Sequence, residues 1–284
     1  MRVGSTGHLS VRSWVRGDRC AGEAGRDRSG VTVVAHRRVR GAQRLHGSGT
    51  YHTRRPQPTE QRNHVNESSK SRQLFTAEER EFVRGRVLDI GAGADPVAPG
   101  AVAFDQAQGD ANRITAFAPG SFDCVYSSHC LEHMHEPVAT LKNWWSLVRP
   151  GGILFVIVPD EDLYEQGRFP SRFNDDHKST FTLSKKRSWS SHSHNVLEMA
   201  QALPQSQLVS LRLNDIGYDR RRAAHNGDKP GVLLRRVLRA YRSLRKRGLA
   251  NSHWMDLWVA HAEGVDQTRG EAVAQIELVV RKLA

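Results

Sequence analysis

The chain has 284 residues, of which 38% are hydrophobic and 25% charged, and its formal net charge is +12. This length allows one large domain or two small ones. Its apolar runs are too short for a signal-peptide core or a membrane span. The three cysteines, Cys20, Cys124 and Cys130, are too few and too scattered to indicate a disulfide framework, so we expect a cytoplasmic protein.

The positive charge is concentrated in residues 1–72, which hold 15 Lys and Arg against 5 Asp and Glu. Only residues 31–34 in this segment show an apolar run. Such a segment cannot bury enough apolar surface to offset its ordering entropy, so we expect a disordered basic leader before a domain over residues 73–284. Two interpretations of the leader stay open: a functional tail, or translated upstream sequence with the native start near Val65.

The first predicted elements of the domain are a short helix and a buried strand. Thr76 and Glu79 have the spacing of a capping box, which predicts a helix that ends near Val83. Arg86–Ile90 is apolar and β-branched enough for a buried strand, and the Gly-x-Gly turn of residues 91–93 follows it. A strand that ends in such a turn is where an open α/β sheet binds a nucleotide-like cofactor.

Further strands and helices alternate along the chain, which is typical of an α/β fold. Pro137–Leu147 has apolar residues at helical spacing, and we expect Trp144 and Trp145 to pack against the sheet. Strands are predicted over residues 102–105, 122–129, 153–159, 208–213 and 275–281, and another helix over residues 194–203.

From Asp89 to Pro159 the order of motifs resembles class I S-adenosylmethionine-dependent methyltransferases of the type 11-like kind. The acid before the glycine turn, an acid after the second strand and the acidic turn at residues 109–111 carry the resemblance. It implies an α/β Rossmann-like fold: a doubly wound, mostly parallel seven-stranded sheet with helices on both faces and an antiparallel last strand at or near the edge. It also implies S-adenosyl-L-methionine as cofactor. The cofactor-binding residues that it implies are Asp89, Gly91, Ala92, Gly93, Asp105, Gln106, Asp110, Ala111, Ser127 and Ser128.

Two features depart from the family's pattern. Asp95 and Pro96 stand where a third glycine is usual, and Pro96 also counts against NAD or FAD. Between Asp105 and Phe122 the chain is too short for a helix, a strand and their loops. We therefore expect either a second helix reduced to a turn or a very short third strand.

A second basic segment lies near residues 220–250. Between Arg220 and Arg247 it has eleven basic residues and one acid, and residues 232–246 place apolar side chains at helical spacing. We expect an amphipathic helix in an insertion of the domain. Two interpretations stay open: a packed helix with a solvated cationic face, or a surface for an acidic substrate or an anionic membrane. Nucleic-acid binding or modification by the basic segments is the alternative function.

His129, Glu132 and His133 form an H-x-x-E-H pattern, which also occurs in zinc peptidases. Such peptidases need both histidines on a long helix and a further acidic ligand, whereas these residues follow a predicted strand. A zinc peptidase is therefore a remote alternative, and we expect no metal ligands in the chain.

Residues 160–181 follow the fifth predicted strand and mix acids, aromatic residues and a histidine. Lying over the carboxyl ends of the strands, they suit a polar acceptor. A hydroxyl acceptor benefits from a base that titrates near neutral pH, so His177 and His129 are the candidate catalytic residues. A loop-organising hydrogen bond is the other interpretation of His177. The expected reaction is methyl transfer to a small-molecule or glycan-like acceptor.

Overall fold

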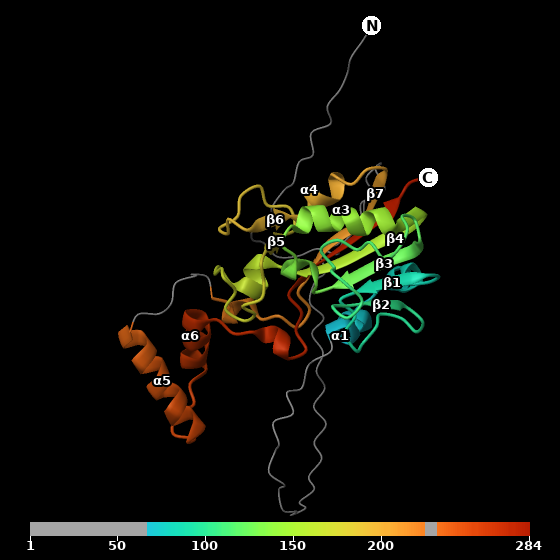
Figure 1. Cartoon of the computed structure of the whole chain (residues 1–284). Helices are drawn as coiled ribbons and strands as arrows, with labels where there is room; N and C mark the ends of the chain where they lie inside the picture. Colours follow the sequence, from blue (N-terminus) through green and yellow to red (C-terminus); the bar gives the residue numbers. More distant parts are fainter. Residues whose placement is uncertain (1–66, 225–231) are drawn as a thin grey trace, which may run out of the picture.

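The computed structural model describes residues 67–224 and 232–284. Within them, six strands form one sheet in the order β2-β1-β3-β4-β8-β7 (Figure 1). The first four run parallel, and β8 runs antiparallel to both of its neighbours. The strands are β1 (Val87–Ile90), β2 (Val102–Phe104), β3 (Phe122–Ser128), β4 (Val148–Pro159), β7 (Ser206–Asn214) and β8 (Gln275–Lys282).

The central strands are apolar along their length because both faces of the sheet are covered. In β4, Leu154 and Val156 belong to the hydrophobic cluster on one face, whereas Phe155 and Ile157 belong to the cluster on the other. Successive side chains of a strand point to opposite faces, so this alternation follows directly from the backbone. A continuous apolar run here therefore indicates a two-sided core, as in a Rossmann-like fold.

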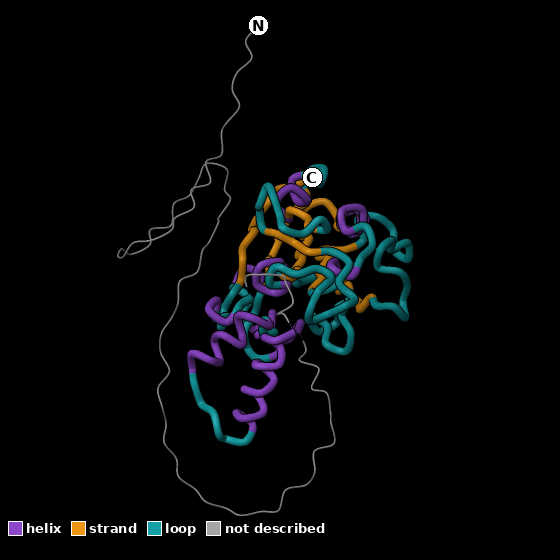
Figure 2. The backbone as a smooth tube through the Cα atoms, turned by 90° about the vertical axis from the view of Figure 1, so that its left-hand side faces the viewer, coloured by secondary structure: helices purple, strands orange, loops and turns teal. Residues whose placement is uncertain are grey.

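Helices lie on both faces of this sheet (Figures 1 and 2). On one face, Trp144 and Trp145 are fully buried, as expected, and their indole N–H groups donate to the carbonyls of Ala111 and Pro204. On the other face, the predicted capping box of Thr76 and Glu79 is present. The helices are α3 (Pro137–Leu147) and α4 (Val196–Gln201) on the first face, and α1 (Glu67–Gln73) and α2 (Ala77–Phe82) on the second.

The six-stranded count differs from the seven strands expected. The segment between β2 and β3 consists of turns, so both the second helix and the third strand are reduced. Side chains of α3 hold this segment in place of a ladder: the Asn143 side chain accepts from Ile114 N at 2.8 Å and donates to the Ile114 carbonyl. Because α3 satisfies these backbone groups, the short connection needs no strand.

The expected domain boundary at residue 73 falls at the last residue of α1, so the rest of this helix belongs to the predicted leader. Ser71 is fully buried, and Arg72 donates to the carbonyl of Pro96 at 2.7 Å and pairs with Asp95. The backbone N–H of Ser69 donates to the other carboxylate oxygen of Asp95. The helix α1 thus holds the loop that departs from the family's glycine pattern. The rest of the predicted leader, residues 1–66, lies outside the described residues.

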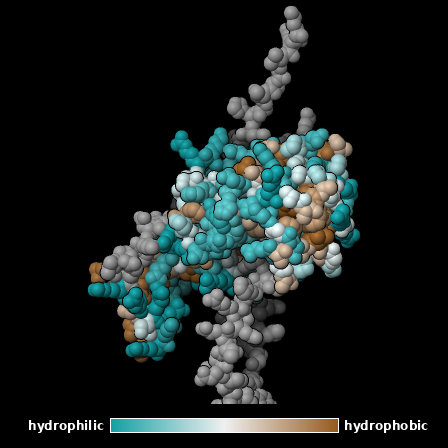
Figure 3. All heavy atoms as spheres, in the orientation of Figure 1, coloured by the Kyte–Doolittle hydropathy of each residue, from teal (hydrophilic) through white to brown (hydrophobic). Residues whose placement is uncertain are grey.

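The segment between β7 and β8 forms the predicted amphipathic helix. This helix is α5 (Val232–Lys246), which runs beside α6 (His253–Glu263) in a hairpin that projects from the sheet (Figures 1 and 2). Leu238 and Tyr241 are buried, and the Tyr241 hydroxyl donates to Asp256 at 2.9 Å. Arginines of α5 pair with acids of α6, and Trp254 is exposed. The surface of the hairpin mixes hydrophobic and hydrophilic residues (Figure 3). The partner of α5 is therefore α6 rather than the sheet.

Short elements complete the described chain. The segment after β4 contains the π-helical turn η2 (Glu161–Glu165) and a two-stranded sheet of β5 (Thr180–Thr182) and β6 (Ser193–Asn195). The 3-10 turns are η1 (Leu131–His133), η3 (Arg220–Arg222) and η4 (Gln267–Arg269). In the part of the chain that the structure describes, each helix is too short or too polar to cross a membrane.

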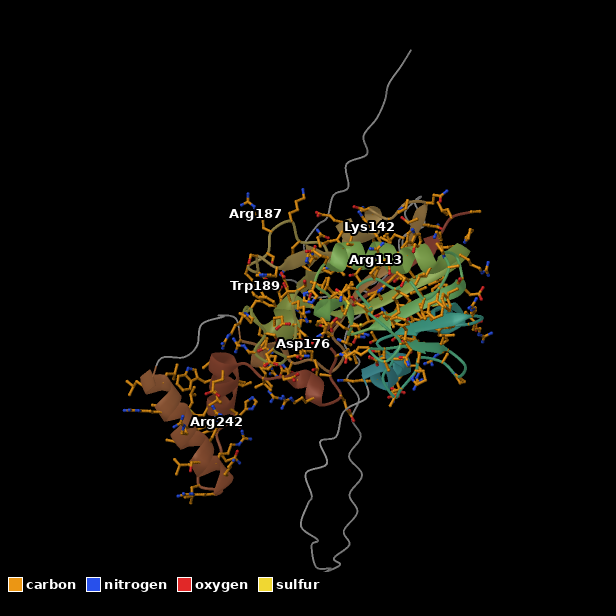
Figure 4. The ribbon with its side chains drawn as sticks, viewed as in Figure 1. Arg113, Lys142, Asp176, Arg187, Trp189 and Arg242 are labelled. Carbon is orange, nitrogen blue, oxygen red and sulfur yellow. The ribbon has the colours of Figure 1, made fainter. Side chains whose placement is uncertain are left out.

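Trp144 tests the packing of α3 on the sheet. Trp144→Ala is expected to lower the free energy of unfolding by about 3–5 kcal/mol, because it leaves a cavity and an unpaired carbonyl. Trp144→Phe should cost less, since it keeps most of the buried area. Trp189→Ala is the control, because Trp189 lies on the exposed β5–β6 connection (Figure 4). Denaturant unfolding measures all three, and equal effects of Trp144→Ala and Trp189→Ala would contradict the packing.

Asp89 tests the buried end of β1. Its side chain is 1% exposed and accepts from Val97 N at 2.6 Å, and burial raises the pKa from 3.8 to about 6. The folded protein therefore holds a proton that the unfolded chain has lost between pH 4 and 6. Because the folded state binds this proton more tightly, the raised pKa stabilises the folded state at low pH by at most about 3 kcal/mol. This stabilisation is lost as the pH rises through about 6.

In Asp89→Asn this part of the pH dependence should disappear, so the melting temperature should fall less between pH 4 and 7 than in the unchanged protein. Asp160, whose pKa burial raises to about 7, keeps its own contribution. Asp175→Asn, at an exposed acid, is the matched control. If the melting temperatures of Asp89→Asn and of the unchanged protein change equally between pH 4 and 7, the Asp89 proton has no part in the pH dependence of stability.

Candidate functional site

The carboxyl ends of β1, β2 and β3 meet at one edge of the sheet. Ile90 pairs with both Phe104 and Ser127, so the residues that follow these three strands lie next to one another. A cavity of about 660 Å³ opens at this edge. It is lined by Gly91, Phe104, Asp105, Gln106, Gly109, Asp110, Ala111, Asn112, His129, Cys130, His133, Met134, His135, Asp176 and Lys178.

The glycine turn fits this edge for steric reasons. Gly91 has φ +78°, and a Cβ there would lie 2.8 Å from the Cβ of Cys130. Gly93 has φ +54° with open space around it, and its N–H donates to Oδ2 of Asp105 at 3.0 Å. The other oxygen of Asp105 accepts from Gln106 N. The Asp105 carboxylate is thus held at the wall of the cavity with both oxygens paired to backbone N–H groups.

Five of the ten predicted cofactor residues line this cavity: Gly91, Asp105, Gln106, Asp110 and Ala111. The others stand behind it or beside it. Asp89 holds the loop through Val97 N, and Ser127 donates its hydroxyl to the carbonyl of Ile90 at 3.0 Å. Ala92 and Ser128 are buried, and Gly93 contacts Asp105.

Several lining residues went unpredicted. Asn112 follows the acidic turn directly, and its side-chain oxygen accepts from His135 N at 2.8 Å, so the turn and the segment after η1 close on each other. Lys178 and Asp176 come from the segment after η2, far along the chain; Asp176 is labelled in Figure 4. The motif spacing could have indicated Asn112, whereas only the folded chain brings Asp176 to this wall.

A second cavity of about 230 Å³ adjoins the first, and His129 and His133 line both. Its other lining residues are mostly polar: Glu132, Tyr164, Asn174, His177, Thr268, Val273, Ala274 and Gln275. Its wall therefore combines the end of β3, the segment after β4 and the segment before β8. Two cavities with a shared wall provide one place for a large ligand and another for a smaller polar one.

His177 lies in the wall of the smaller cavity and is almost completely buried. Its Nδ1 pairs with Oε1 of Glu165 at 2.7 Å, and the ring stacks on Tyr164 with centroids 5.2 Å apart. A carboxylate on one ring nitrogen fixes the tautomer and leaves the other nitrogen for chemistry. The expected loop-organising contact is thus present in a form that also suits a functional histidine.

His129 has φ +52°, which is unusual for a residue with a side chain. Its Nδ1 lies 3.4 Å from Oε1 of Glu132, and its Nε2 lies 3.2 Å from Oε1 of Gln275. Burial alone would raise the pKa of Glu132, but the hydrogen bond from His129 and the charges of His129, His177 and His133 hold it below its usual range. A strained backbone at a shared wall of two cavities is a feature of functional sites.

The H-x-x-E-H residues do not have the arrangement of a zinc peptidase. His129 follows the end of β3, and Glu132 and His133 belong to the single 3-10 turn η1. The pattern therefore does not place two histidines one turn apart on a long helix.

Residues 59–193 match the family model of a methyltransferase domain. A search of curated proteins finds no match to the chain. Similar solved structures include a SAM-dependent methyltransferase of Thermotoga maritima, at 15% identity and TM-score 0.38, over 77% of this chain and 88% of that one.

Two further structures are similar at the same low level. The YcgJ protein of Bacillus subtilis has 13% identity and TM-score 0.40, over 78% of this chain and 100% of that one. A SAM-dependent methyltransferase of Methanosarcina mazei has 10% identity and TM-score 0.40, over 74% of this chain and 98% of that one. The family match spans the glycine turn, β1 to β4 and most of the residues that line the two cavities, so this part of the chain is a methyltransferase domain.

Proposed function

We propose that this methyltransferase uses S-adenosyl-L-methionine and transfers the methyl group to a hydroxyl of a small-molecule or glycan-like acceptor. The observation that carries the proposal is the pair of cavities with His129 and His133 in their shared wall. The larger cavity has the place and the acids for the cofactor. The smaller one, with its polar lining, has the place for an acceptor hydroxyl beside it.

The residues of the larger cavity fit the cofactor. Asp105 offers a carboxylate at the end of β2, where both hydroxyls of a ribose can donate to it. Gly91 lets the chain approach without a side chain, and the turn at Asp110, Ala111 and Asn112 suits the adenine end. When bound, the cofactor supplies a sulfonium methyl group that a nucleophile can displace.

The smaller cavity favours an oxygen acceptor over an apolar one. Its wall includes the side chains of Glu132, Asn174 and Gln275, which can hold hydroxyl groups by hydrogen bonds. Enclosure next to the cofactor cavity would orient the acceptor, and positioning supplies much of the rate of a displacement.

We place the activation of the acceptor hydroxyl on His177. Glu165 accepts from its Nδ1, so the remaining ring nitrogen is the one able to act. His129 is the second candidate catalytic residue, because it lines both cavities. Both of its nitrogens face side-chain oxygens, so its ring is held in place between them.

Cofactor binding tests the larger cavity. Asp105→Ala should weaken S-adenosylmethionine binding about ten- to hundredfold, because two hydrogen bonds to a carboxylate are lost. Gly91→Val should abolish it, since the new side chain meets Cys130 and needs a φ that valine rarely adopts. Isothermal titration measures both, with Glu81→Ala on the exposed part of α2 as control. Unchanged affinity in both site variants would overturn the cofactor assignment.

Turnover tests the smaller cavity. His177→Ala should lower kcat about a hundredfold or more while S-adenosylmethionine affinity stays within twofold, because the loss falls on a step after cofactor binding. Transfer of labelled methyl groups to a fractionated cell extract identifies the acceptor and then measures the rate. Normal kinetics of His177→Ala on that acceptor would remove His177 from the mechanism.

A further inference from the structure

Three side chains in the wall of the smaller cavity converge as metal ligands do. One carboxylate oxygen of Glu132 and one ring nitrogen each of His133 and His177 all lie within 4.8 Å of one another. Glu132 and His177 are buried, and His133 is partly buried. Ligands around one first-row ion at about 2.1 Å are separated by roughly 3–3.5 Å, so a small closure of these side chains would suffice.

Each histidine of this cluster also pairs with a carboxylate. His177 pairs through Nδ1 with Glu165 at 2.7 Å, and His133 pairs through Nδ1 with Asp176 at 2.8 Å. Metal-binding histidines nearly always have such a partner, which fixes the tautomer and makes the ligating nitrogen more basic. Two histidines oriented in this way around one glutamate form a set of two imidazoles and a carboxylate.

Two buried carboxylates in and beside the cluster each have an oxygen without a hydrogen bond. Oε2 of Glu132 and Oε2 of Glu165 are buried and have no hydrogen-bond partner among the described residues. Among the described residues, Glu132 forms its ion pair with the imidazole of His129, and Glu165 forms its ion pair with the imidazole of His177. A buried carboxylate oxygen without a hydrogen bond is costly, and a divalent ion bound to Glu132 would offset that cost.

The fold holds the cluster together through the backbone. The carbonyl of Glu132 accepts from Lys178 N at 2.8 Å and from Ser179 N at 3.2 Å. This contact ties the turn η1 to the segment that carries His177. The ring centroids of His133 and His177 lie 5.0 Å apart as a result.

We propose that Glu132, His133 and His177 bind one divalent first-row transition ion, of the class of Zn²⁺, Mn²⁺ or Co²⁺. Two imidazoles and a carboxylate are the donors that such ions take at sites with open positions. Glu165 and Asp176 act as positioning residues through the histidines.

The role of the ion rests on the proposed function and deepens it. An open position faces the smaller cavity, where it takes the oxygen of the acceptor hydroxyl. Coordination lowers the pKa of that hydroxyl, so its O–H bond breaks at neutral pH, the electron pair stays on the metal-bound oxygen and the proton leaves to water. In this arrangement the ring nitrogen of His177 that is not paired with Glu165 binds the ion, so the ion rather than the imidazole activates the hydroxyl, and the acceptor class is an alcohol or phenol.

Titration with Co²⁺ tests the site, because its visible absorption reports the ligands directly. The full chain, stripped with chelator and free of cofactor, should bind one equivalent of Co²⁺, and Zn²⁺ should displace it. Glu132→Gln and His177→Ala should lose the absorption bands and at least a hundredfold in affinity. Glu165→Gln should keep the bands with affinity lower by about ten- to hundredfold. His192→Ala, at an exposed histidine, should bind as the unchanged protein does.

Three results would overturn the proposal: less than half an equivalent of Co²⁺ bound, equal binding by His177→Ala and the unchanged protein, or equal losses in His192→Ala. If His177→Ala fails to fold by circular dichroism, His133→Ala replaces it, since His133 is less buried. S-adenosylmethionine titration of the stripped protein is a separate measurement. Cofactor binding without Co²⁺ binding rejects only the metal site, and the reverse result rejects only the cofactor assignment.

Discussion

Parallel pairing of β1 to β4 is the constraint on which the site depends. Because these strands run in one direction, their carboxyl ends meet at one edge, and the chain must turn there after each of them. Gly91, Asp105 and His129 are the residues at those turns. The apolar cover on both faces of the sheet keeps the strands in register, so packing far from the cavity sets the positions of polar groups that line it.

The departures from the family's pattern have a common physical explanation. Asp95 and Pro96 take no part in lining the larger cavity, because α1 satisfies them through Arg72 and Ser69. The turns between β2 and β3 are likewise satisfied, by Asn143 of α3. In both places a helix replaces what a glycine or a strand would otherwise supply, and the loops keep a defined shape.

The segment after β4 decides what distinguishes this methyltransferase. It supplies Tyr164 and His177 to the smaller cavity, its Glu165 pairs with His177, and the backbone of Glu132 anchors it. The proposed ion would lie at this junction, between the smaller cavity proposed for the acceptor and the larger cavity proposed for the cofactor. The α5–α6 hairpin stands apart from both cavities, so its cationic and apolar side chains have no role in the chemistry proposed here.

Local pattern in the sequence determined the strands of the six-stranded sheet, the Thr76 capping box, α3 and the family motifs, because periodicity and short spacing encode them. It did not indicate β5 or β6, and β6 occupies the start of the helix predicted over residues 194–203. The tertiary structure alone decided which loop residues face the cavity: Asp89 turns inward to Val97, whereas Asp105 lies at the wall. It alone also brought His177 to Glu132. Residues far apart along the chain meet through backbone contacts whose partners no local pattern specifies, so the sequence left them as separate candidates.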